Sequence, residues 1–424
     1  MKKKALASSF LVVALGISLP SLKQELGGVP ARERRESAAF AAESSSRGST
    51  AKLPARPNRV VLVVIDGVRW QDVFEGVDRT LAQIYRLSQD EVVGPGRLVP
   101  NLHRLATSDG IAVGAPGYGE PMRAAGPHYV SQPGYLELFT ERPAATCFSN
   151  ECPPVKEPTF LDAVASATPP GEASAAVVAS WEVIARTASA APKDFVLSAG
   201  QQRGANQDAL GVSPRAIHAL EAARTASPSP GHGEYRPDRY TREIALAYLE
   251  ERHPRFLFLG LGDSDEYAHQ GDYRGYLRAL HEADKAVGEL LETLDRMGDD
   301  GRNTTVLVTT DHGRERAFMS HGSFAPESAR VWMVAAGNVQ PLGRIPIPRT
   351  THLYDVGPTI RALMGLPEGA GPGSPIRELA ADTGQNVLAL DDRGTESKPD
   401  QDFSTGPSAS RQARKPPAIE STLR

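Results

Sequence analysis

The chain has 424 residues, 40% of them hydrophobic, and a formal net charge of −4. This length can form one large α/β domain or two smaller ones, and the composition is that of a globular protein. Lys and Arg number 47 against 51 Asp and Glu, a balance that gives no indication of nucleic-acid binding.

The N-terminal segment, MKKKALASSFLVVALGISLPS, has the form of a secretory signal because lysines precede an apolar stretch from Ala5 to Leu19. That stretch is short for a membrane span, which needs about 20 residues. The tripeptide AFA at residues 39–41 has the form of a cleavage site but lies far downstream, so an uncleaved anchor stays an alternative. We expect residues 1–22 to be a signal peptide or anchor. The protein would then be secreted or periplasmic, touching a membrane only if this segment is uncleaved.

Residues 23–57 and 391–424 are rich in small, polar and charged side chains and show no apolar period. This composition predicts a disordered linker and a disordered C-terminal tail. Residues 58–390 remain as a single domain. Cys147 and Cys152, the two cysteines of the chain, predict a local disulfide in an exported protein, with two metal thiolates as the alternative.

Within residues 58–390, short runs that are apolar throughout alternate with segments of helical spacing. Strands are expected at residues 60–65, 175–179, 195–197, 256–261, 305–308 and 331–335, and helices at residues 100–110, 135–139, 239–249, 276–294 and 354–363. Apolar strands separated by helices predict an α/β fold, a doubly wound, mostly parallel sheet covered by helices on both faces. Residues 192–237, which include SPSPGHGE, fit this pattern least and carry a loop signal.

Three of the apolar runs end in aspartate: VVLVVIDG at Asp66, FLFLGLGDSD at Asp263 and Asp265, and VLVTTDHG at Asp311. Ligands of an open parallel sheet bind outside the carboxyl ends of its strands. If the three strands are neighbours, their carboxylates converge there and would repel one another unless a cation balanced them. Asp263 by itself is expected to be a turn residue or a supporting acid.

Histidines accompany these carboxylates. His269 follows Asp265 by four residues, which places both on one face if the segment is helical, and another His-Gly pair follows the Asp-His-Gly of the third run. Mixed Asp and His ligands suit zinc, and carboxylate-rich sites also accept manganese or magnesium. The six candidate ligands, enough for two open metal sites, are Asp66, Asp265, His269, Asp311, His312 and His321.

A candidate nucleophile lies in HYVSQPGYLELF, where Ser131 precedes Pro133 and a helical apolar pattern. Ser is a good N-cap and Pro is tolerated in the first turn, so we expect Ser131 to cap a helix. A helix N-terminus favours an anion, and a metal ion at the Ser131 oxygen would make that oxygen a nucleophile. Taken alone, such a serine is most simply a helix cap.

Together these segments resemble those of the alkaline phosphatase superfamily. VVLVVIDGVRW and VPNLHRLATSDG are similar to its opening strand and helix, SQPGY to its nucleophile segment, and DSDEYAH, TTDHG and SHG to its metal-ligand segments. HLYDVGPTIRALMGLP resembles the helix that closes these domains. The resemblance covers about residues 58–390, and its specificity comes from segments that occur in the family's order.

The resemblance implies one zinc ion held by Asp265, His269 and His321 and a second held by Asp66, Asp311 and His312, with Ser131 as nucleophile between them. It implies attack of the serine on phosphorus, a phosphoserine intermediate and hydrolysis of that intermediate. The expected protein is an exported phosphoric ester hydrolase that acts on a small phosphorylated substrate. Its two divalent ions would be Zn²⁺, with Mn²⁺ or Mg²⁺ as alternatives, and the oligomeric state stays open.

Several positions depart from the family's patterns. Gly134 and Tyr135 stand where the phosphodiesterase branch has Asn-His, and the Cys/Ser-x-Pro-x-Arg motif of sulfatases is absent, which disfavours sulfatase activity. Arg314 is the nearest candidate in sequence for a phosphate-clamping arginine. A phosphodiesterase, phosphonate hydrolase or phosphotransferase on the same site is the alternative function. A non-catalytic exported binding protein is less favoured, because all six candidate ligands are present.

Overall fold

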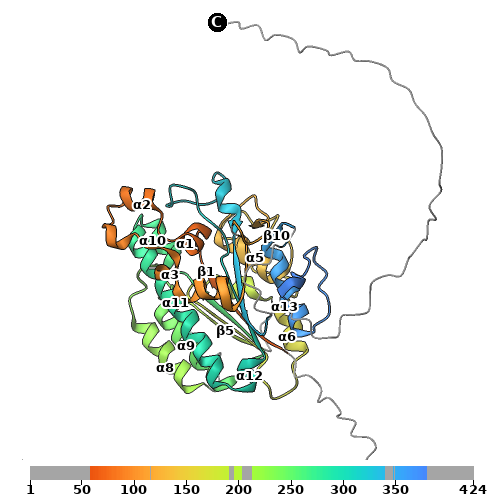
Figure 1. The fold of residues 1–424 in the computed structure, drawn as a ribbon. Coiled ribbons are helices and arrows are strands. Elements are labelled where there is room, and N and C mark those ends of the chain that lie inside the picture. Colours follow the sequence, from red (N-terminus) through yellow and green to blue (C-terminus); the bar gives the residue numbers. More distant parts are fainter. Residues whose placement is uncertain are drawn as a thin grey trace, which may run out of the picture. The chain divides into compact units, whose positions relative to one another are not determined.

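The computed structural model describes residues 58–114, 116–190, 195–202, 213–339, 347 and 349–379. Its main sheet has seven strands in the order β2-β9-β7-β1-β6-β4-β5 (Figure 1). They are β1 (Arg59–Ile65), β2 (Ile111–Val113), β4 (Ala175–Ala179), β5 (Val196–Ala199), β6 (Phe256–Leu261), β7 (Thr304–Thr309) and β9 (Met333–Gly337). Five of them, from β7 to β5 in this order, run parallel, whereas β9 is antiparallel to both β7 and β2. The mostly parallel sheet expected from the sequence is therefore confirmed.

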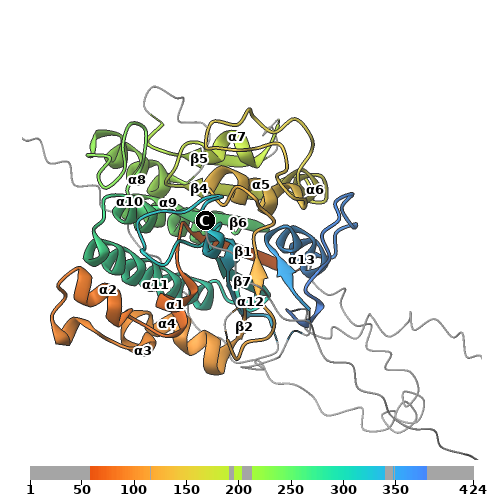
Figure 2. The same cartoon turned by 90° about the horizontal axis from the view of Figure 1, so that it is seen from above.

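Helices cover both faces of this sheet, as Figure 2 shows from above. One face carries α9 (Asp238–Arg252) and α11 (Tyr273–Arg296), and the other carries α5 (Ser131–Thr140), α6 (Phe160–Ser166) and α13 (Val356–Met364). The remaining helices are α1 (Trp70–Phe74), α2 (Arg79–Ile84), α3 (Pro95–Leu98), α4 (Pro100–Arg104), α7 (Ile184–Ala188), α8 (Pro214–Thr225), α10 (Asp263–His269) and α12 (Asp299–Arg302). A small second sheet joins β10 (Thr351–His352), β3 (Met122–Arg123) and β8 (Arg330–Val331).

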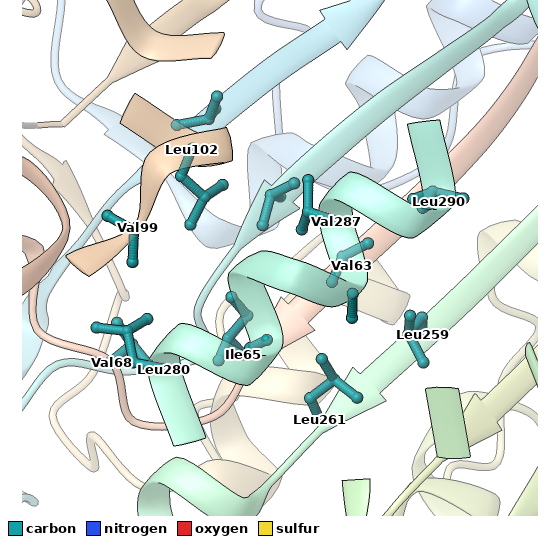
Figure 3. Packing of buried hydrophobic residues seen from close by; sticks show 14 of the residues in the cluster. Val63, Ile65, Val68, Val99, Leu102, Leu259, Leu261, Leu280, Val287 and Leu290 are labelled. Carbon is teal, nitrogen blue, oxygen red and sulfur yellow. The ribbon is translucent and has the colours of Figure 1, made fainter. Parts of the chain in front are cut away.

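The central strand β1 is buried on both faces, because its side chains alternate between two hydrophobic clusters. Val63 and Ile65 pack with residues of α11, and Figure 3 shows Leu280 and Val287 of that helix over the sheet. Leu62, between Val63 and Val61, belongs to the cluster on the opposite face. A strand that is apolar throughout is thus explained by a core on each side of it.

Three elements differ from the prediction. The strand expected at residues 331–335 is divided between the two sheets at Trp332, whose indole N–H donates to the Val68 carbonyl at 3.0 Å. The helix expected at residues 100–110 continues beyond α4 as a π turn, Leu105–Asp109. Residues 192–237 contain α8, which the loop signal SPSPGHGE hid and which Ser213 caps by accepting a hydrogen bond from the Ala216 amide at 3.3 Å.

Other expectations concern short features of the chain. Cys147 and Cys152 form a disulfide, which confirms that prediction. The predictions for residues 1–22, 23–57 and 391–424 lie outside the described residues. Among the helices of the described part of the chain, we find none that combines the length and apolar character needed to cross a membrane.

Candidate metal centre

The carboxyl ends of three adjacent parallel strands bring the candidate ligands together. β7, β1 and β6 are neighbours in the sheet, so the segments that follow them start at one edge. Asp66 directly follows β1, Asp311 comes two residues after β7, and Asp265 lies in the first turn of α10, which follows β6. The convergence expected from the three aspartate-terminated runs is therefore present.

The first ligand group combines Asp265, His269 and His321, whose ligand atoms all lie within 4.8 Å of one another. Asp265 and His269 are one turn apart on α10, with Oδ2 and Nε2 separated by 3.0 Å. The Nε2 atoms of His269 and His321 are also 3.0 Å apart. The other ring nitrogen of His321, Nδ1, lies 2.9 Å from the Tyr129 carbonyl, which orients the ring so that Nε2 faces the group.

The second ligand group shares one residue with the first. It consists of Asp66, Asp265 and His312, again within 4.8 Å of one another. His312 Nε2 lies 3.4 Å from Asp66 Oδ1, 3.5 Å from Asp311 Oδ2 and 4.0 Å from Asp265 Oδ1. The compact group therefore contains Asp265 in place of the expected Asp311, because the two oxygens of Asp265 face different histidines. Asp311 lies next to this group, since its Oδ2 is 3.5 Å from His312 Nε2.

Asp311 shows why a cation fits here. Its side chain is fully buried, Oδ1 accepts a hydrogen bond from the Gly67 amide at 3.1 Å, and Oδ2 has no partner in the described part of the protein. Burial and then the neighbouring Asp66 raise the pKa of Asp311 well above its ordinary value. A buried carboxylate oxygen without a donor is costly unless a ligand balances it. The mixed oxygen and nitrogen donor set matches zinc and also manganese.

Ser131 is part of this centre but is not the cap of its helix. Val130 is the N-cap of α5, and Ser131 is the first helical residue. The Ser131 Oγ lies 3.3 Å from Asp66 Oδ1 and 3.2 Å from His312 Nε2. The expected cap role is therefore wrong, since the hydroxyl faces the second ligand group instead of the backbone amides of its own helix.

Gly134 and Tyr135, which depart from the phosphodiesterase pattern, both have a structural role at the centre. A Cβ at Gly134 would lie 2.4 Å from the Asp311 carbonyl oxygen, so glycine lets α5 approach the end of β7. The Tyr135 hydroxyl donates to Asp66 Oδ2 at 3.0 Å. Sequence reasoning missed Tyr135 because its ring fits the apolar pattern of α5. Its spacing of four residues from Ser131, one helical turn, was the available signal.

Arg314, the candidate phosphate clamp, is instead committed within the protein. It is buried and forms an ion pair with Asp265, and it also donates to the carbonyls of Phe318 at 2.7 Å and Met319 at 3.0 Å. Burial works against the charge of Asp265, but Arg314 holds the pKa of this carboxyl well below its usual range. The arginine thus keeps the shared ligand ionised and is not free to clamp a substrate.

The two buried histidines have opposite proton affinities. Burial disfavours the charged form of His312, but Asp311 and Asp66 beside it raise its pKa to about 9. Burial and the neighbouring His312 lower the pKa of His321 to about 3. The neutral His321 presents a free lone pair, which is the form that binds a metal ion, and a cation at the second group would replace the proton on His312.

Comparisons with known proteins agree with this geometry. The family model of the Metalloenzyme superfamily matches residues 234–368. A phosphopentomutase of Alkaliphilus oremlandii is 35% identical over 74 residues, which are 17% of this chain and 17% of that protein. A 2,3-bisphosphoglycerate-independent phosphoglycerate mutase 2 of Methanosarcina barkeri is 26% identical over 154 residues, 34% of this chain and 28% of that protein. These matches therefore span less than a third of either relative's length.

The fold is shared with a solved structure, that of a mutant of the alkaline phosphatase PafA. That structure has a TM-score of 0.53 with 11% identity and covers 77% of this chain and 99% of that chain. The sheet and the ligand groups at its carboxyl edge define an α/β metalloenzyme. The matching family model, the two mutases and this shared fold support an assignment to the alkaline phosphatase superfamily.

Proposed function

We propose that the protein is an exported, zinc-dependent hydrolase of phosphoric esters that uses Ser131 as its nucleophile. The observation that carries the proposal is the position of the Ser131 hydroxyl, 3.2 to 3.3 Å from His312 and Asp66, two members of one ligand group. A second ligand group shares Asp265 with the first, so ions in the two groups would lie close together, as two-metal phosphoryl transfer requires. Export is supported by the signal-like N-terminus and the disulfide.

The residues of the chain have distinct parts in this proposal. Asp265, His269 and His321 would hold one ion, and Asp66, His312 and Asp311 would hold the other, with Asp265 reaching both. The ions would supply positive charge that lowers the pKa of the serine and stabilises the charge that develops on the phosphoryl oxygens. Ser131 forms the bond to phosphorus while the alcohol leaves, and water then releases phosphate from the phosphoserine.

Neighbouring side-chain and backbone groups orient the residues that face the Ser131 hydroxyl. The Tyr135 hydroxyl fixes Asp66 Oδ2, so Asp66 Oδ1 is the oxygen that faces Ser131. His312 Nδ1 lies 2.8 Å from the Gly313 carbonyl, which sets the ring so that Nε2 faces the serine. Each contact preserves one geometry of the nucleophile and thereby reduces the reorganisation needed for reaction.

The proposal is tested with purified protein and p-nitrophenyl phosphate. We expect about two metal equivalents per chain, release of p-nitrophenol, and loss of activity in EDTA that zinc restores. Ser131→Ala should abolish turnover and prevent covalent labelling by phosphate, whereas Ser166→Ala, an exposed serine on α6, should have no effect. Full activity of Ser131→Ala would contradict the covalent mechanism, and activity that EDTA does not affect would contradict the metal dependence.

A second candidate is a phosphotransferase, because the relatives that match in sequence include a phosphopentomutase and a phosphoglycerate mutase. Both reactions begin with the same phosphoserine and differ in what accepts the phosphoryl group. Turnover of p-nitrophenyl phosphate in the presence of glycerol distinguishes them. A hydrolase releases inorganic phosphate and p-nitrophenol in equal amounts, whereas a transferase releases less phosphate and forms glycerol phosphate.

A further inference from the structure

Large hydrophobic side chains that remain exposed are few, and most of them lie close to the metal centre. Among the described residues they are Ile84, Phe148, Met319 and Phe324, with exposed fractions of 64%, 63%, 45% and 72%. All except Ile84 belong to segments that carry, or contact segments that carry, Ser131 or a candidate ligand. We infer that the centre acts on phosphate esters whose alcohol half is apolar, and this inference rests on the proposed function.

Phe324 lies near the segment that leads into the nucleophile, with Gly322 close to both. A Cβ at Gly322 would be 3.4 Å from the Phe324 ring and 3.8 Å from the side chain of Val130, the residue before Ser131. Gly322 directly follows the ligand His321, which itself faces the Tyr129 carbonyl. The exposed ring therefore lies beside the contact between the nucleophile segment and a metal-ligand segment.

Phe148 approaches the same segment from the disulfide loop, residues 147–152. Its ring forms an edge-on contact with His128, with centroids 4.9 Å apart. The loop is attached to the residue after the nucleophile, since the Gln132 side chain donates to the Cys152 carbonyl at 3.0 Å and accepts from the Cys152 amide at 2.9 Å. The disulfide and these hydrogen bonds hold an exposed aromatic ring in a fixed place close to Ser131.

Two further apolar side chains extend this surface. Trp181, at the carboxyl end of β4, is half-buried, and its ring centroid is 6.4 Å from that of Tyr135, which bonds to Asp66. The Met319 side chain lies 3.3 Å from the position of a Cβ at Gly271, two residues after the ligand His269. Apolar groups thus come from the segments after β4, after β7 and before and after Ser131, and each of these segments carries or contacts a residue of the centre.

The charges near the centre disfavour an anionic alcohol half. Arg314, the buried arginine of the site, is committed to Asp265. The ions would balance the ligand carboxylates and the phosphate, and a second anionic group on the substrate could not use Arg314 as a counter-charge. An apolar group would instead cover exposed rings, which is favourable.

The test is the binding of phosphonates, which needs no turnover. Calorimetry on zinc-loaded protein should show that phenylphosphonate or octylphosphonate binds about tenfold more tightly than methylphosphonate. This is the gain expected if the apolar group of the ligand contacts both exposed rings, those of Phe148 and Phe324. The phenyl and octyl arms distinguish an aromatic from a hydrocarbon alcohol half. Phe148→Ala and Phe324→Ala should each reduce this preference about threefold and leave methylphosphonate affinity unchanged. Ile84→Ala, an equally exposed apolar residue on α2, should keep the full preference.

Three outcomes would overturn the inference, and a fourth would support it. Equal affinity for the three phosphonates in the unaltered protein would overturn it, and so would variants that weaken all three phosphonates equally. Binding of none of them would overturn it as well. A preference for apolar phosphonates without any hydrolysis of phosphate esters would instead support the inference on substrate class and contradict the proposed hydrolase, so the two failures are distinguishable. Both phenylalanines are exposed, so their replacement leaves the core intact.

Discussion

Two buried aspartates, Asp72 after β1 and Asp311 after β7, differ in what surrounds them. Asp72 is fully buried, accepts hydrogen bonds from the hydroxyls of Tyr273 at 2.9 Å and Tyr276 at 3.0 Å, and lies 3.4 Å from Arg69 Nε. Asp311 is equally buried, but the groups beside it include Asp66 and Asp265, and its Oδ2 has no partner in the described structure.

Burial raises the pKa of both carboxyls, so burial does not distinguish a structural acid from a ligand. The partners do. Tyrosine hydroxyls and an arginine satisfy Asp72 within the protein, whereas Asp311 has like charges beside it and an oxygen without a hydrogen-bond donor, so either a proton on His312 or a bound cation must balance it. We therefore expect Asp72 and Asp311 to respond differently to mutation and to metal removal.

The largest effect should come from removing a histidine ligand. His312→Ala and His321→Ala should each retain about one metal equivalent, and the double variant none, because each histidine belongs to a different ligand group. The loss of activity should exceed the roughly 10- to 100-fold typical of residues that only support a ligand. Mass spectrometry of metal content checks this, with His218→Ala, an exposed histidine on α8, as control. A double variant that still held one ion would mean that both histidines serve the same site.

Matched substitutions of Asp311 and Asp72 test the difference between these two buried carboxylates. Asp311→Asn should abolish tight binding of one ion but leave the metal-free protein as stable as before or more stable, because it removes a buried like charge. Asp72→Asn should keep both ions and lower the free energy of unfolding by about 3 kcal/mol, since a buried ion pair with Arg69 is lost. Urea unfolding in EDTA and a zinc titration measure the two effects. Equal destabilisation by both substitutions would remove the distinction between the groups.

Much of this organisation follows from the sequence. The apolar runs predicted five parallel strands because buried strands of such a sheet have no polar face, and the aspartates at three strand ends predicted where the centre lies. The strand at residues 331–335 was predicted without its break. Hydropathy does not show that Trp332 turns inward to bond Val68 while the flanking residues join different sheets.

The contacts among the site residues were harder to predict from the sequence. The sequence identified Asp265 as a ligand, but sharing of Asp265 between two groups depends on the direction of each oxygen, which is set by α10 and Arg314. Tyr135 and Arg314 act through contacts with residues far away in the chain, Asp66 and Asp265. Such contacts become visible only when the strands are placed side by side.

Glu137 is a third buried carboxyl, and it should make the stability of the protein depend on pH. This buried acid on α5 accepts a hydrogen bond from the Ala125 amide at 2.9 Å, and burial raises its pKa from 4.5 to about 8. The folded state therefore binds the proton more tightly than the unfolded chain. Its contribution to stability is present below about pH 4.5 and is lost as the pH rises to about 8.

Replacing Glu137 by glutamine removes this titration. The free energy of unfolding of the Glu137→Gln variant, relative to the unaltered protein, should increase with pH across this window, by an amount on the order of a few kcal/mol at the upper end. Urea unfolding in EDTA at several pH values measures the slope. Glu157→Gln, an exposed glutamate, is the control and should show no such slope. A constant difference between Glu137→Gln and the unaltered protein would show that Glu137 titrates normally.

The smallest effect is expected at Asp284 on α11, which is also buried but fully satisfied. Its oxygens accept from the backbone amides of Leu102 at 2.7 Å and Asn101 at 3.1 Å, at the start of α4. Asp284→Asn keeps one acceptor and should cost about 1 kcal/mol of unfolding free energy, with metal content and activity unchanged. Burial raises the pKa of Asp284 as it does that of Asp311. Loss of zinc from Asp284→Asn would therefore show that burial, and not the absence of internal donors, marks the metal ligands of this fold.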